Sequence, residues 1–77
     1  MVVYDGGWVE PDDEDKGRGK RGEPVDHHKY WNQALHKAVQ KVPTGEKGPF
    51  AVNRYVTVDH ENPGWVDGYR IALDDGA

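Results

Sequence analysis

The sequence predicts a small α+β protein in which one amphipathic helix packs on an antiparallel sheet in two layers. Apolar residues between Asp26 and Val42 recur at helical spacing. Two later stretches, 50–58 and 68–73, alternate apolar with other residues in the period of two that strands show. The 77 residues fit a single domain, of order β-α-β-β if the N-terminal segment joins the sheet.

The first segment, residues 1–9, is β-prone but interrupted. Its β-forming residues at 2–4 and 8–9 flank Gly6-Gly7, and paired glycines favour turns and positive φ. We expect a bent edge strand or a tight hairpin, and the sequence leaves open whether this segment pairs with the later strands.

Residues 10–25 are rich in charge and poor in apolar side chains, so we expect a flexible charged loop before a core of residues 26–77. An acidic block precedes a basic one: Asp12, Asp13, Glu14 and Asp15, then Lys16, Arg18, Lys20 and Arg21. The acids could bind a cation such as Ca²⁺, but the EF-hand spacing is absent. The basic block could contact phosphates or an acidic partner. We favour the third interpretation, a solvated loop of mixed charge.

The helix is expected to begin after Asp26, whose carboxylate suits an N-cap, and to end before Pro43. Its apolar stripe comprises Tyr30, Trp31, Ala34, Leu35, Ala38, Val39 and Val42. We expect this stripe to pack on the apolar face of a hairpin formed by Phe50, Val52, Val56 and Val58 with Tyr69, Ile71 and Leu73.

The two strands are expected to pair antiparallel, because the residues between them, 60–64, are turn formers. Arg54 is the exception on the apolar face. The opposite face mixes small, aromatic and polar groups: Ala51, Asn53, Tyr55, Thr57, Val66, Arg70 and Ala72. This second face is either solvated or packed on another copy of the chain.

Composition narrows the functional classes. The chain has no cysteine, which removes disulfides and thiolate zinc sites, and its small core favours oligomerisation as a source of stability. The net charge of -4 argues against a general nucleic-acid coat. No apolar run approaches the roughly 20 residues of a membrane span, and the first residues lack a signal-peptide pattern. We therefore expect a cytoplasmic protein with no membrane partner.

Histidines and tryptophans are the remaining candidates for chemistry. His27, His28 and His36 lack the i, i+4 histidine pairing of helical zinc sites, so we expect exposed histidines and no metal site. His60 stands beside an acid, but no nucleophile is suggested nearby, so we predict no catalytic site. Trp65 either marks a contact surface or folds back over the end of the helix.

The order of these elements resembles the dodecins and small bacterial proteins similar to them. The family's W-x-x-A-x-x-x-A helix pattern is matched by Trp31, Ala34 and Ala38, and its hairpin patterns are matched by residues 50–56 and 69–73. The resemblance covers Tyr30 to Asp74. It implies a symmetric homo-oligomer, typically a hollow dodecamer, that binds flavins.

Two positions differ from the family. Gly48-Pro49 stands where dodecins carry the aromatic residue that stacks on flavin, and Arg70 falls close to the family's glutamine. We therefore expect no bound cofactor, with flavin as the alternative.

We predict a non-enzymatic, self-associating interaction or assembly domain, whose partner is another copy of the chain or a different protein rather than nucleic acid. One alternative is a dodecin-like binder of an aromatic small molecule of the flavin type, using Trp65, Tyr55 and Arg70. A second alternative is a nucleic-acid or inhibitor-type binding protein. It would use the basic residues of the charged loop and the polar face of the helix.

Overall fold

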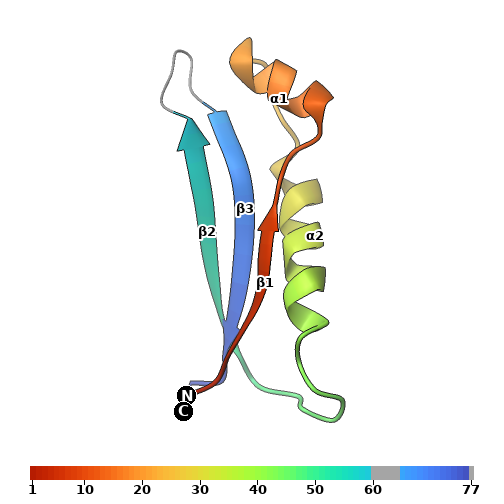
Figure 1. Cartoon of the computed structure of the whole chain (residues 1–77), viewed down its shortest axis with the longest axis vertical. Coiled ribbons are helices and arrows are strands. Elements are labelled where there is room, and N and C mark those ends of the chain that lie inside the picture. The colour runs from red at the N-terminus through yellow and green to blue at the C-terminus, as the bar shows by residue number, and fades with distance from the viewer. Residues whose placement is uncertain (60–64, 77) are drawn as a thin grey trace.

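The computed structural model describes residues 1–59 and 65–76. Its elements are, in chain order, β1 (Val3–Val9), α1 (Asp13–Lys20), α2 (His27–Val39), β2 (Ala51–Asp59) and β3 (Trp65–Asp74). The strands form one antiparallel sheet in the order β1-β3-β2, with α2 along the sheet and α1 at one end (Figure 1). The predicted α+β fold is confirmed, and the N-terminal segment supplies its third strand. The predicted turn at 60–64, with His60, lies outside the described residues.

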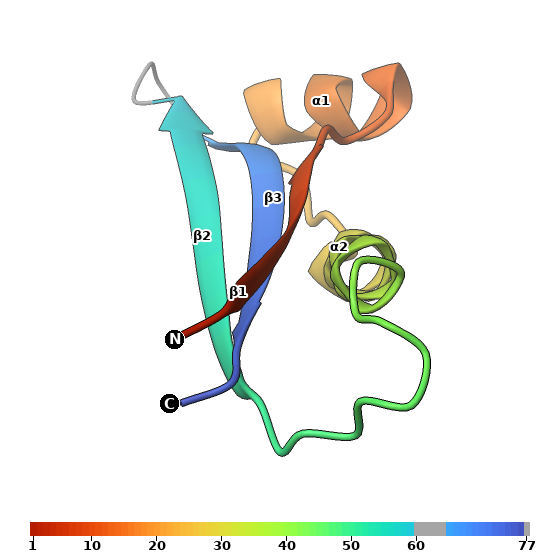
Figure 2. The ribbon, with the colours of Figure 1, turned by 60° about the horizontal axis from the view of Figure 1, so that its bottom comes forward.

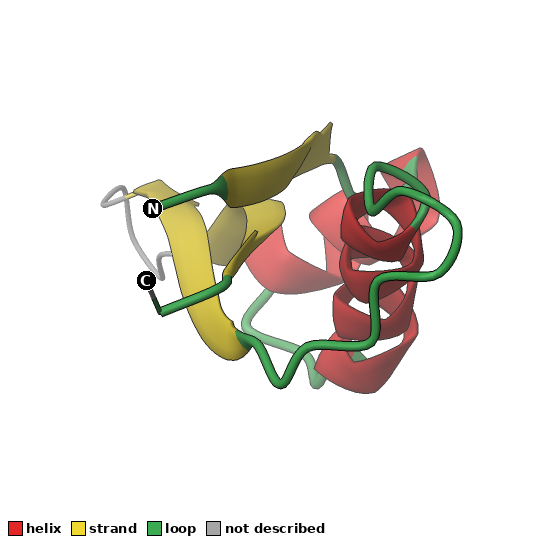
Figure 3. Ribbon diagram, turned by 90° about the horizontal axis from the view of Figure 1, so that it is seen from below, coloured by secondary structure: helices red, strands yellow, loops and turns green. Residues whose placement is uncertain are grey.

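The helix α2 begins at the predicted N-cap. The Asp26 carboxylate accepts a hydrogen bond from the His28 backbone N–H at 3.1 Å. The helix ends at Val39, and its buried residues are Tyr30, Ala34 and Ala38. They pack with Val9, Tyr69, Ile71 and Leu73 to form the core. Both helices lie on the same side of the sheet, and the opposite face carries no element among the described residues (Figure 3).

The strand β2 lies outside this core. Val52, Val56 and Val58 are 49%, 45% and 46% exposed, so the prediction that they pack beneath the helix is wrong. A helix about 10 Å wide covers about two strands spaced 4.8 Å apart, and α2 lies against β1 and β3. Figure 2 shows β2 at the edge of the sheet that is farther from α2.

The exposed flank of α2 follows from the same arrangement. Leu35 and Val39 belong to the predicted apolar stripe, yet they are 39% and 50% exposed. They lie on the side of the helix turned away from Tyr30, Ala34 and Ala38, which face the sheet. The prediction is right for the center of the stripe and wrong for these two residues.

The charged stretch contains the helix α1, which corrects the expectation of a loop throughout residues 10–25. The Asp12 side chain caps the helix by accepting from the Asp15 backbone N–H at 2.9 Å. The acidic block occupies the first turn and the basic residues occupy the last turn. This order of charges matches the helix dipole. Glu14 and Arg18 add an i, i+4 ion pair at 2.6 Å.

Candidate functional site

The outer edge of β2 is long and regular. The strand has nine residues, AVNRYVTVD, and it contains no proline, glycine or lysine to discourage pairing with another strand. The shift in its register with β3 falls between Thr57 and Val58, which pair with Gly68 and Val66. The extra residue at this point, Asp67, therefore belongs to β3, so β2 keeps its regular alternation. Its outer edge pairs with no strand among the described residues.

The other edge of the sheet, formed by β1, is protected. Its register with β3 shifts between Asp5 and Trp8, where Gly7 has a φ of 81°. The Asp5 carboxylate accepts from the Gly7 N–H at 2.8 Å. Lys37 of α2 donates to the Trp8 carbonyl at 3.1 Å. Bulges and lysines of this kind prevent an edge strand from pairing with a second chain.

Apolar side chains of β2 face the same side as α2. Val52, Arg54 and Val56 pair with Leu73, Ile71 and Tyr69 of the core face of β3. On this face, the Arg54 guanidinium of β2 lies 5.6 Å from the center of the Trp31 ring of α2. The valines on this strand have no covering layer among the described residues.

On the opposite face, one row of side chains crosses all three strands. Trp8 of β1 and Tyr55 of β2 both pair with Arg70 of β3. The Arg70 guanidinium lies 5.0 Å from the Trp8 ring center and 4.3 Å from that of Tyr55, and its Nε is 3.5 Å from the Asp5 carboxylate. These are cation–π contacts between exposed aromatic rings and a half-buried cation.

The structure therefore brings together two of the three residues predicted to bind a ligand. Trp65 is five positions before Arg70, at the first residue of β3, where it pairs with Asp59. Its side chain packs against Gly19 of α1, since a Cβ built at Gly19 would lie 2.6 Å from that of Trp65. Sequence reasoning missed Trp8, the third member of the row across the sheet.

The four basic residues of the charged stretch contact groups of their own chain. The contacts are Lys16 with Glu10 at 3.4 Å, Arg18 with Glu14 at 2.6 Å and Asp15 at 3.0 Å, Arg21 with Glu23 at 2.6 Å, and Lys20 at 5.6 Å from the Trp65 ring center. Each positive charge is therefore partly neutralised or already in contact with an aromatic ring. This arrangement weakens the case for a phosphate-binding surface.

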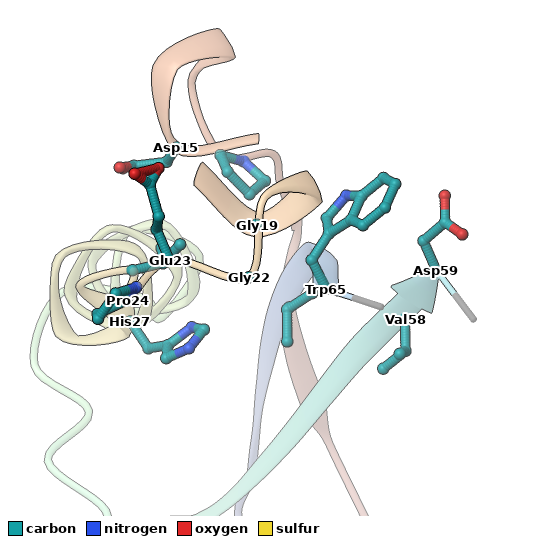
Figure 4. A pocket seen from close by; sticks show the side chains of 12 residues that line it. Asp15, Gly19, Gly22, Glu23, Pro24, His27, Val58, Asp59 and Trp65 are labelled. Carbon is teal, nitrogen blue, oxygen red and sulfur yellow. The ribbon is translucent and has the colours of Figure 1, made fainter. Parts of the chain in front are cut away.

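A cavity of about 570 Å³ lies between α1, the start of α2 and the ends of β2 and β3 (Figure 4). Its apolar lining comes from prolines, valines and the Trp65 ring, and its polar lining from Asp15, Glu23, His27 and Asp59. Sequence reasoning missed this cavity, because α1, which forms one of its walls, was expected to be a loop.

Two buried tyrosines support the polar lining of the cavity. Tyr30 donates its hydroxyl to Asp15 and accepts from the Asp12 backbone N–H at 3.1 Å. The Tyr69 hydroxyl lies 2.5 Å from His27 Nδ1. The two tyrosine rings stack with centers 5.2 Å apart. Asp15 and His27 are thus held in place by the two largest fully buried side chains of the core.

Both tyrosine hydroxyls are protonated at neutral pH. Burial raises the pKa of Tyr69 to about 12. Burial and the hydrogen bond to Asp15 also raise the pKa of Tyr30. A buried phenol in this state donates hydrogen bonds and does not serve as a base.

Comparison with protein-family models, curated protein sequences and solved structures finds no match to the chain. Within residues 1–59 and 65–76, no three histidine or acidic side chains gather in a way that could hold a metal ion. No helix in the described part of the chain is long and apolar enough to cross a membrane.

Proposed function

We propose that this protein is a self-associating assembly domain in which β2 pairs with β2 of a second copy. The observation that carries the proposal is the difference between the two edges of one sheet. A bulge and a lysine protect β1, whereas β2 is a nine-residue, valine-rich strand without such protection. Unprotected edges of this length are the template for strand addition.

The register of the pairing follows from symmetry. An antiparallel pair of identical strands has a twofold axis, and the alternation of faces requires the axis to pass through a residue pair. Centering on Arg54 would place two guanidinium groups opposite each other, which is repulsive. Centering on Tyr55 uses all nine residues of β2. It places Val52 opposite Val58, Arg54 opposite Val56 and Asn53 opposite Thr57.

This register extends contacts that already exist in a single copy. The cross-strand row of Trp8, Arg70 and Tyr55 would continue through Tyr55 of the second copy into its own row. The nine residue pairs would form about eight to ten backbone hydrogen bonds, since every second antiparallel pair exchanges two. The valines of both copies would lie side by side on the face that carries α2.

The oligomeric state tests the proposal, with two lysine variants as a matched pair. We expect the native protein at about 100 µM to have twice the 8.7 kDa mass of one chain by light scattering coupled to gel filtration, because strand addition is concentration-dependent. Val56→Lys introduces a charge on the β2 edge and should give the monomer mass. Val3→Lys introduces the same charge at a comparably exposed valine of β1 (48% against 45%) and should remain a dimer.

Two results would contradict the proposal. One is a native protein that stays monomeric over the whole accessible concentration range. The other is dissociation by Val3→Lys as readily as by Val56→Lys, which would place the interface elsewhere.

The other predicted functions have less support. A flavin-type ligand stacking on the face of Tyr55 that Arg70 occupies would have to displace the guanidinium, which lies 4.3 Å from the center of that ring. A nucleic-acid partner would have to compete with the acidic groups that contact Lys16, Arg18 and Arg21. Self-association needs neither rearrangement.

A further inference from the structure

The helix α1 has few contacts that hold it in place. Its eight residues include no apolar side chain, and the glycines at 17 and 19 weaken a helix interior. Isolated helices shorter than about 12–15 residues are at best marginally stable in water. Among the described elements, the backbone of α1 lies close only to β3, at one end of the sheet (Figure 1). Contacts at two points therefore decide whether α1 stays folded.

The first point of attachment is a buried tyrosine of α2. Tyr30 donates its hydroxyl to the carboxylate of Asp15, which is 7% exposed. The same hydroxyl accepts from the Asp12 backbone N–H at 3.1 Å. Lys29 adds an ion pair with Asp12 at 3.1 Å, but both side chains are exposed, and such surface pairs contribute little. The Tyr30 hydroxyl is therefore the main connection between α1 and α2.

The second point of attachment is Trp65 at the start of β3. A Cβ built at Gly19 would lie 2.6 Å from the Cβ of Trp65, 2.9 Å from its Cγ and 3.4 Å from the Cδ1 that is bonded to the indole nitrogen. This nitrogen is buried and has no hydrogen-bond partner among the described residues. Figure 4 shows it on the edge of the ring toward Gly19. The last turn of α1 thus covers an indole N–H that would gain a hydrogen bond from water if the helix moved away.

Movement of α1 would also open the cavity of about 570 Å³ beside it. The helix and the segments on either side of it supply these lining residues: Pro11, Asp15, Gly19, Gly22, Glu23 and Pro24. The rest of the lining belongs to the start of α2 and the ends of β2 and β3. The segments 10–12 and 21–26 belong to no helix or strand, so the chain can change direction on both sides of α1 without loss of another element.

We propose that α1 is a lid, which detaches from Trp65 and unfolds as a unit while the sheet and α2 remain folded. Detachment and unfolding are coupled, because so short a segment does not maintain a helix without its contacts to Tyr30 and Trp65. The open state exposes the Trp65 ring and removes one wall of the cavity, so the lid controls access to that space. All of these contacts lie within one copy of the chain, so the lid is independent of pairing through β2.

Hydrogen exchange tests whether the lid opens separately from the rest of the fold. The readout is the indole N–H of Trp65 in NMR spectra of the ¹⁵N-labelled full chain at pH 7, assigned by its loss in Trp65→Phe. Its protection factor is compared with those of the backbone amides of α1 and of Ile71 and Leu73 in β3. We expect the Trp65 N–H and the α1 amides to have similar protection factors, roughly tenfold or more below those of the two β3 amides.

Two glycines of the lid provide a matched pair of substitutions. Gly17→Ala and Gly19→Ala add the same methyl group to the same helix, which favours the helix in both cases. At Gly17, the only described neighbour of the new Cβ is Arg21 Nη1, at 3.2 Å, the end of a flexible side chain, so protection of the Trp65 N–H should rise roughly fivefold. At Gly19, the new Cβ would collide with Trp65, so the closed position is blocked and protection should fall roughly tenfold. The β3 amides should be unaffected in both variants.

Removal of the Tyr30 hydroxyl tests the first attachment. Tyr30→Phe should lower the protection factor of the Trp65 N–H roughly tenfold, because the buried Asp15 carboxylate loses a hydrogen bond. Tyr69→Phe is the control, since it removes a buried hydroxyl that contacts His27 of α2, and it should leave this protection factor unchanged. The proposal is overturned if the Trp65 N–H exchanges only as slowly as the β3 amides, or if α1 shows no protection in the native protein. It is equally overturned if the two glycine variants change the protection factor in the same direction, or if Tyr30→Phe has no effect.

Discussion

Gly6→Ala is the substitution whose effect follows most directly from the structure. A Cβ built at Gly6 would lie 2.5 Å from the backbone nitrogen of Ala38, and 2.8 Å and 2.9 Å from the carbonyl carbon and Cβ of Lys37. Carbon atoms in good contact are about 3.5–4.0 Å apart. The substitution therefore requires β1 and α2 to separate by about 1 Å at the point where they lie closest.

The cost is set by which atoms would have to move. Overpacking typically costs about 1–3 kcal/mol, and the obstructing atoms here are mainly helix backbone, so we expect about 3 kcal/mol for Gly6→Ala. For a domain of this size the midpoint of thermal unfolding should fall by about 12–24 °C. That is a large part of the roughly 5–15 kcal/mol by which native domains are stable.

A second glycine provides the control. Gly45 has a φ of 96°, and a Cβ built there would meet nothing within 4 Å. Gly45→Ala therefore carries the conformational penalty alone, about 1–2 kcal/mol. Urea unfolding of both variants, followed by circular dichroism at one protein concentration, compares the two costs. A Gly6→Ala protein no less stable than Gly45→Ala would refute the close packing of β1 on α2.

Three further predictions concern charge and proton binding. Burial raises the pKa of Tyr69 to about 12, so the folded state holds the proton of this hydroxyl more tightly than the unfolded state does. The contribution of Tyr69 to stability should therefore be constant below pH 10 and fall between pH 10 and 12 by on the order of 1 kcal/mol per pH unit. Urea midpoints across this range should fall less steeply for Tyr69→Phe than for the exposed control Tyr55→Phe, and equal slopes would contradict this. Asp12→Ala, which removes the cap of α1, should cost about 1 kcal/mol and speed hydrogen exchange in α1, whereas Asp13→Ala should not. Arg70→Lys should lower the unfolding free energy by about 1 kcal/mol, because an ammonium cannot stack between two rings as a guanidinium does; an unchanged urea midpoint would show that the stacking contributes nothing.

The part of the fold that local pattern controls was predictable. The N-cap at Asp26 and the buried positions Tyr30, Ala34 and Ala38 follow from side-chain chemistry and helical period alone. The period of β2 was also recognised, but the sequence did not indicate that α2 leaves this strand uncovered. Alternation marks two faces of a strand without indicating the order of strands in the sheet, and this order decides which strands a single helix can cover.

In the charged stretch, residues 10–25, the local structure itself was predicted wrongly, because a helix stands where a loop was expected. Glycine content and the lack of apolar residues argued for a loop, and these criteria carry no information about contacts with distant residues. The order of its charges was the signal that could have predicted α1, because acids before bases is what a helix dipole favours. The contact between Gly19 and Trp65 could not be predicted, since it joins residues 46 positions apart.

The position of Trp8 depends on a single bulge. Tyr4 pairs with Leu73 of the core face, so strict alternation would place Trp8 on the same side, facing the helix. The register shift between Asp5 and Trp8 reverses this and places Trp8 opposite Arg70 on the open face. A one-residue irregularity moves every later side chain to the other face, and sequence alone left open whether residues 1–9 contained one.

The two edges of the sheet provide the strongest argument about function. Exposed valines alone would be weak evidence, because surfaces of folded proteins contain much apolar area. However, β1 combines a register shift, an Asp5 hydrogen bond to the backbone of the same strand and a lysine from α2, features that disfavour pairing with a further strand. The alternating valines of β2 form the pattern of a half-buried strand, yet the chain leaves them uncovered. In the pairing that we propose, the second copy places a matching row of valines beside them.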